Sequence, residues 1–134
     1  MDKILIIDDE EDIRIALKRV LSREGYQIEL SESATEAVHR IESGESFSIV
    51  ISDILMSGMS GIDFTKFIAD KKINLPVILI TGNPNLSSAE AAIRYHAYEY
   101  ISKPVDRTQL LSVVKRALEV KNQKEFRLRK IDVV

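Results

Sequence analysis

The sequence predicts an α/β domain in which a doubly wound sheet of five parallel strands carries helices on both faces. The first observation is a series of five short apolar runs, rich in β-branched or aromatic residues, which are typical of strands. The second is that a segment with apolar residues at helical spacing follows each run. This alternation favours parallel strands joined by right-handed crossovers. We expect the strands at residues 3–8, 26–31, 47–53, 76–81 and 98–102.

The helices are predicted from apolar residues that recur every three or four positions. Five such stripes begin at Ile13, Ala34, Phe64, Leu86 and Leu110. Ser87 and Glu90 have the spacing of a capping box in the fourth helix, and Asp106 is expected to cap the fifth helix. Gly25 stands where the first helix should end, because glycine adopts the left-handed backbone that often follows a helix.

The apolar pattern of the strands also predicts their order. The runs at residues 4–7, 49–51 and 77–80 are continuously apolar, as expected for strands that are covered on both faces. The other two runs alternate with polar residues, which places them at the edges. The flavodoxin-like (βα)5 arrangement, with strand order 2-1-3-4-5, satisfies this pattern. Ligands of such a sheet bind beyond the carboxyl ends of the strands, here between the first and third strands.

Composition excludes several classes of protein. The chain has 134 residues, the size of one domain, and no cysteine, which excludes a disulfide framework and a thiolate metal site. The apolar run near the N-terminus is too short for a signal peptide or a membrane span. A net charge of −2 gives no general attraction to nucleic acid. We therefore expect a cytoplasmic protein without direct nucleic-acid or membrane contact.

Five polar side chains are expected together at the carboxyl ends of the strands. Asp8 and Asp9 follow the first strand, Asp53 ends the third, Thr81 ends the fourth and Lys103 follows the fifth. Three carboxylates in one pocket repel one another unless a cation joins them, and Mg²⁺ prefers such oxygen ligands. A carboxylate that the metal leaves free can act as a nucleophile toward phosphorus. These residue types predict phosphoryl chemistry with Mg²⁺, and they leave open which aspartate reacts.

With these residues in this order, the chain resembles the receiver domain of two-component response regulators, the CheY-like family. The similar segments are ILIIDDE at residues 4–10, ISDILM at 51–56, GMSGID at 58–63, VILITG at 77–82 and AYEYISKP at 97–104. The resemblance implies that Asp53 accepts the phosphoryl group. It assigns Mg²⁺ to Asp8, Asp9 and Asp53, with Asp8 acting mainly through water. The backbone carbonyl of Leu55 would supply a further ligand.

The resemblance also implies how such a switch works. Lys103 would pair with Asp53 and then with its phosphate, and Thr81 and Tyr100 would form the switch pair. The implied function is a phosphorylation-dependent signalling switch of a phosphorelay, rather than a turnover enzyme. The implied partner is a sensor histidine kinase or a phosphotransfer protein. The fourth helix, fifth strand and fifth helix would form the readout surface, which is also a candidate homodimer surface.

Two other functions are alternatives for these residues. A phosphohydrolase of the haloacid dehalogenase-like class also uses an aspartyl nucleophile, but it places an Asp-x-Asp pattern on the first strand. This chain has Asp8-Asp9-Glu10 there, with no aspartate two residues after Asp8. A receiver-shaped interaction module that is never phosphorylated is the third function, and the intact acidic residues argue against it.

The chain departs from the family pattern at two positions and at its C-terminus. Ser57 stands where the family commonly has proline, and His96 stands where it often has glycine, so His96 is expected to cap the fourth helix with a strained backbone. We assign residues 1–120 to the receiver domain. Residues 121–134 either extend the fifth helix or link it to an output domain, or form a frayed tail. Seven Lys or Arg and two Glu lie between Lys115 and Lys130, as a solvated face or a contact surface for an acidic partner.

Overall fold

The computed structural model describes the backbone of residues 2–133 and the side chains of residues 2–127. The strands are β1 (Lys3–Ile7), β2 (Gln27–Ser31), β3 (Ile49–Asp53), β4 (Val77–Thr81) and β5 (Glu99–Ser102). The helices are α1 (Glu11–Ser22), α2 (Ala34–Glu42), α3 (Gly61–Asp70), α4 (Leu86–Arg94) and α5 (Arg107–Val133). The strands are parallel and lie in the order β2-β1-β3-β4-β5, which confirms the predicted sheet.

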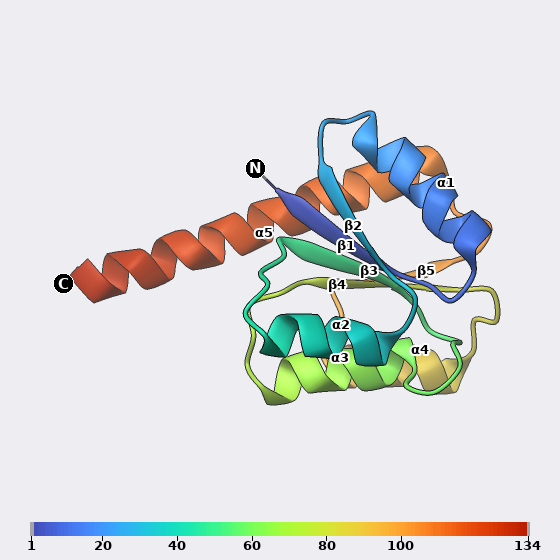
Figure 1. Ribbon diagram of the computed structural model, residues 1–134. Helices are drawn as coiled ribbons and strands as arrows, with labels where there is room; N and C mark the ends of the chain where they lie inside the picture. The colour runs from blue at the N-terminus through green and yellow to red at the C-terminus, as the bar shows by residue number, and fades with distance from the viewer. Residues whose placement is uncertain (1, 134) are drawn as a thin grey trace.

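Two apolar cores lie on opposite faces of the sheet because successive side chains of a strand point to opposite sides. Along β1, Ile4 and Ile6 pack with α1 and α5, whereas Leu5 and Ile7 pack with α2 and α3. Figure 1 shows this division, with α1 and α5 on one face and α2, α3 and α4 on the other. The central strands are buried on both faces, which is why their sequences are continuously apolar.

The beginning of α4 differs from the prediction. The side-chain oxygen of Asn85 accepts a hydrogen bond of 2.8 Å from the backbone N–H of Ser88, and α4 begins at Leu86. The expected capping box of Ser87 and Glu90 is therefore wrong, because Asn85 caps the helix two residues earlier and places Ser87 inside the first turn. Asp106 caps α5 as predicted, since it accepts a hydrogen bond of 2.8 Å from the N–H of Gln109.

The ends of two helices agree with the sequence. Gly25, after α1, has φ of 89°, and His96, after α4, has φ of 62°, so both adopt the left-handed backbone expected there. The fifth helix continues without a break past residue 120 as far as Val133, and Val134 lies outside the described residues. The assignment of residues 121–134 to a linker stays a prediction. In the described part of the chain, no helix combines the length and the apolar character that crossing a bilayer requires.

Candidate functional site

Four carboxylates meet at the carboxyl ends of β1 and β3. These strands are neighbours in the sheet, and their register pairs Ile7 with Ser52, which places Asp8 beside Asp53. Both side chains are buried, with exposed fractions of 2% for Asp8 and 5% for Asp53, whereas Asp9 and Glu10 are exposed. Each of the four offers a carboxylate oxygen, and these oxygens lie within 4.8 Å of one another. The donor set consists of oxygen alone, as Mg²⁺ prefers.

One ammonium group faces the two buried carboxylates. Lys103 follows β5, and its Nζ lies 3.0 Å from Oδ2 of Asp53 and 3.9 Å from Oδ2 of Asp8. Its backbone N–H donates a hydrogen bond of 2.8 Å to the carbonyl of Thr81, which fixes the lysine at the end of β4. The peptide bond from Lys103 to Pro104 is cis. One ammonium group faces several carboxylates, so the pocket has more acidic than basic groups. Lys103 lies closer to the carboxylate of Asp53 than to that of Asp8.

The buried carboxyl group of Asp8 holds a proton more readily than an ordinary aspartate. Burial is the largest cause that raises its pKa, and the nearby negative charge of Asp53 raises it further. The backbone N–H of Glu10, which donates to Oδ1 of Asp8 at 2.9 Å, and the charge of Lys103 lower the pKa but do not outweigh burial. A divalent cation at this position would relieve the same repulsion without a proton.

The loop after Asp53 is held against the start of α3 by a close approach that only glycine permits. The N–H of Gly61 donates a hydrogen bond of 3.0 Å to the carbonyl of Ile54. A methyl group on its Cα would lie 2.2 Å from the carbonyl oxygen of Asp53, a distance that real Cβ atoms essentially never show. Sequence reasoning noted Gly61 only as part of a motif and missed this packing role.

Two further contacts position the acidic residues, and neither was predicted. The backbone N–H of Ser57 donates to Oδ2 of Asp9 at 3.3 Å, a bond that proline at this position could not make. The Arg14 guanidinium donates to the carbonyl oxygen of Asp8 at 2.5 Å. The departure from the family pattern at Ser57 thus adds a hydrogen-bond donor. Leu55 lies in the same loop with its side chain 59% exposed.

Thr81 and Tyr100 connect this rim of the sheet to α4. Thr81 is buried, and its Oγ1 accepts a hydrogen bond of 3.0 Å from the N–H of Asn83. The hydroxyl of Tyr100 accepts from the N–H of Asn85 at 3.2 Å and lies 2.7 Å from Oγ of Ser88. These hydrogen bonds hold the tyrosine against the first turn of α4. The sequence predicted the pair Thr81 and Tyr100 but not the contacts of Tyr100 with Asn85 and Ser88.

Known proteins resemble this chain over most of its length. A family model described as the response regulator receiver domain matches residues 4–115. The chain is 37% identical over 116 residues to the C4-dicarboxylate transport transcriptional regulatory protein DctD of Rhizobium meliloti, an alignment that covers 87% of this chain and 25% of DctD. The chain thus spans about a quarter of the length of such curated relatives.

Solved receiver structures share the fold. A CheY-like response regulator receiver domain protein from Methanospirillum hungatei has a TM-score of 0.87 at 29% identity, covering 92% of this chain and 98% of that one. The response regulator TrrA from Thermotoga maritima, solved in complex with Mg²⁺ and BeF, has a TM-score of 0.79 at 36% identity, covering 87% of this chain and 99% of TrrA. These similarities support the receiver interpretation and give no support to the dehalogenase-like alternative.

Proposed function

We propose that this chain, which belongs to the response regulator receiver domain family, is a signalling switch that accepts a phosphoryl group on Asp53. The observation that carries the proposal is the position of the Asp53 carboxylate. It is buried, it lies 3.0 Å from the Lys103 ammonium, and it belongs to a group of four carboxylates with oxygens within 4.8 Å. Asp8 lies farther from Lys103, and Asp9 is exposed.

The acidic residues fit a bound Mg²⁺. Asp8, Asp9 and Asp53 would hold it, with the carbonyl oxygen of Leu55, and Glu10 lies close enough to assist. Burial is the main cause that raises the pKa of Asp8, the negative charge of Asp53 raises it further, and a cation at this position would relieve that second effect. The ion would supply positive charge that neutralises the incoming phosphoryl oxygens. Lys103, as a cation, and Thr81, as a hydrogen-bond donor, would also stabilise those oxygens.

The chemistry of the proposed transfer follows from the protein's own groups. A carboxylate oxygen of Asp53 attacks the phosphorus of a phosphohistidine on a sensor kinase or phosphotransfer protein, and the nitrogen–phosphorus bond breaks as the oxygen–phosphorus bond forms. Lys103 exchanges its contact with the carboxylate for one with the phosphoryl group. The hydroxyl of Thr81, which now accepts from Asn83, turns to donate to a phosphoryl oxygen. Such a domain changes state once per transfer and is a switch rather than a turnover enzyme.

The signal would reach the surface through α4. When Thr81 turns toward the phosphoryl group, the ring of Tyr100 follows, and its hydroxyl bonds to the first turn of α4 must rearrange. The proposed readout surface consists of α4, β5 and α5, and a second copy of the chain is one candidate partner for it. Phosphorylation would thus bias an element that has two arrangements.

The acceptor is tested by measuring intact mass after incubation with Mg²⁺ and acetyl phosphate. We expect one phosphoryl adduct that is stable in acid and labile in base. Asp53→Asn should abolish it, whereas the matched control Asp70→Asn, at an exposed position at the end of α3, should keep it. An adduct that persists in Asp53→Asn would place the acceptor elsewhere. Absence of any adduct from acetyl phosphate and from a histidine kinase would refute the switch.

A further inference from the structure

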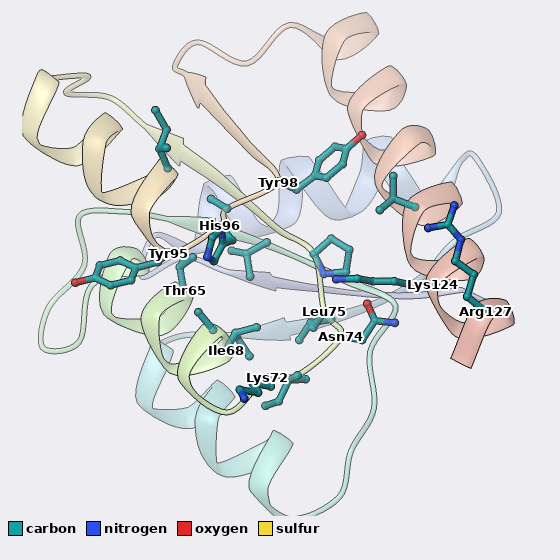
Figure 2. Close-up of a pocket in the computed structure, with 17 residues that line it drawn as sticks. Thr65, Ile68, Lys72, Asn74, Leu75, Tyr95, His96, Tyr98, Lys124 and Arg127 are labelled. Atoms are coloured by element: carbon teal, nitrogen blue, oxygen red, sulfur yellow. The ribbon is translucent and has the colours of Figure 1, made fainter. Parts of the chain in front are cut away.

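A groove of about 900 Å³ lies at the end of the sheet opposite the acidic site. It opens between the C-terminal ends of α3 and α4 and the second half of α5, as Figure 2 shows. The floor is apolar, and Leu75, Pro76 and Val77, where β4 begins, contribute to it. Ile93 of α4 and Val120 of α5 line it although 78% and 42% of their surfaces remain exposed. Two exposed aliphatic side chains on separate elements thus border one apolar floor.

The charge around the groove has one sign. Lys72, His96, Lys124 and Arg127 line it, and among the side chains that the structure describes no carboxylate does. Within residues 2–127, none of Lys72, Lys124 and Arg127 forms an ion pair. Lys124 and Arg127 project from α5 beside the groove (Figure 2). The free charges at this site therefore all favour an anionic ligand.

A buried amide adds a directional signal. Nδ2 of Asn74, in the loop between α3 and β4, is buried without a hydrogen-bond partner among the described residues, and Asn74 lines the groove. A buried donor without a partner costs free energy, and a rotation of the Asn74 side chain that brings Nδ2 into the groove would let it donate to an oxygen of a bound molecule. The Asn74 amide nitrogen is a hydrogen-bond donor, so, like the surrounding cations, it favours a ligand that offers oxygen atoms.

We propose that this groove binds an acidic amphipathic segment of a partner protein. Apolar side chains of the segment would cover the floor between Ile93 and Val120. Its carboxylates would meet Lys72, Lys124 and Arg127, and one of its oxygens would accept from Asn74 once the amide turns toward the groove. A short segment with apolar residues on one side and acidic residues along its flanks matches both the shape and the charge of the site.

Other occupants fit these observations less well. A symmetric dimer through this groove would bring Lys124 and Arg127 close to the same residues of the second copy, and like charges oppose such an interface. A bilayer surface is flat and would leave a concave floor uncovered. A nucleic-acid backbone would neutralise the cations but leave the apolar floor exposed to water. A convex peptide segment uses the floor and the cations together.

The proposal is tested with a fluorescein-labelled synthetic helix that carries leucines on one face and glutamates on its flanks. Its anisotropy is measured as the unphosphorylated full chain is added, so the outcome does not depend on Asp53. We expect saturable binding that weakens as salt is added. The double variant Lys124→Glu/Arg127→Glu should weaken binding by about tenfold or more, because two attractive pairs with glutamates of the peptide become repulsive. The matched variant Lys115→Glu/Arg116→Glu changes the same charge on exposed positions of the same helix outside the groove and should bind nearly as wild type.

A charge-swapped peptide separates specific docking from misfolding. The Lys124→Glu/Arg127→Glu variant should bind the same helix with lysines in place of glutamates more tightly than the wild-type protein does. Ile93→Ser should lower the affinity for the acidic peptide, although it removes no charge. Equal losses in the two double variants, or no saturable binding, would overturn the proposal. So would tighter binding to phosphatidylserine vesicles, to duplex DNA or to a second copy of the chain that depends on the same two residues.

Discussion

Gly61 is the first residue of α3, and replacing it with alanine sets two effects against each other. Helix propensity alone predicts a gain, because alanine is favoured over glycine in helices by up to about 1 kcal/mol. The structure predicts a loss. The new methyl group would lie 2.2 Å from the carbonyl oxygen of Asp53, and the two backbones would have to separate by about 0.8 Å to reach the shortest distance that real Cβ atoms show. The sign of the change therefore distinguishes the two effects.

The size of the loss follows from what the separation disturbs. Forcing extra volume into a packed site costs about 1–3 kcal/mol. The hydrogen bond of 3.0 Å from the Gly61 N–H to the carbonyl of Ile54 would lengthen as well, at about 1 kcal/mol. Subtracting the gain in propensity leaves a decrease of about 1–3 kcal/mol in the free energy of unfolding. Because the displaced backbone belongs to Asp53, phosphorylation by acetyl phosphate should also slow.

Urea denaturation of Gly61→Ala measures this decrease, and Gly82→Ala is the matched control. A methyl group at Gly82 would have Cδ of Lys103 as its nearest neighbour at 3.7 Å, which is an ordinary contact. Its free energy of unfolding should stay within about 0.5 kcal/mol of wild type. If Gly61→Ala proved as stable as wild type or more stable, the close approach of α3 to β3 would not be rigid, and the reasoning would be wrong.

Three further predictions concern the rim residues. The pKa of Asp8 is raised in the folded protein, so as pH rises the unfolded chain loses this proton first and the free energy of unfolding falls between the two pKa values. Without Mg²⁺, Asp8→Asn should therefore be more stable than wild type at neutral pH, and urea titrations below the ordinary carboxyl pKa should show no such advantage. Tyr100→Phe should cost about 1 kcal/mol and speed amide exchange in the first turn of α4, and unchanged exchange would contradict the hydroxyl contacts. Lys103→Ala should still become phosphorylated but show smaller exchange changes at Thr81 and Tyr100 than wild type; equal changes would argue against its role.

The sequence by itself determined the sheet and the membership of the acidic rim. Continuous apolar runs such as Ile4–Ile7 are stable only when both faces of the strand are covered. They therefore had to be central strands and could not lie at the edges of the sheet. The carboxyl ends of parallel strands share one edge of the sheet. For this reason Asp8, Asp53 and Lys103 could be brought together from strand order alone, although Lys103 lies 50 residues from Asp53 in the chain.

The tertiary structure decided the distances and the contacts between backbone groups. Lys103 lies nearer to Asp53 than to Asp8, and Asn85 rather than Ser87 caps α4, because several residues can satisfy the same group and packing selects one. The approach of Gly61 to Asp53 depends on how α3 packs against the end of β3. The groove lies between the C-terminal ends of α3 and α4 and the second half of α5, and it forms only where these three segments meet. The spacing of apolar residues determines which face of an element is buried, whereas these contacts depend on how separate elements are positioned relative to one another.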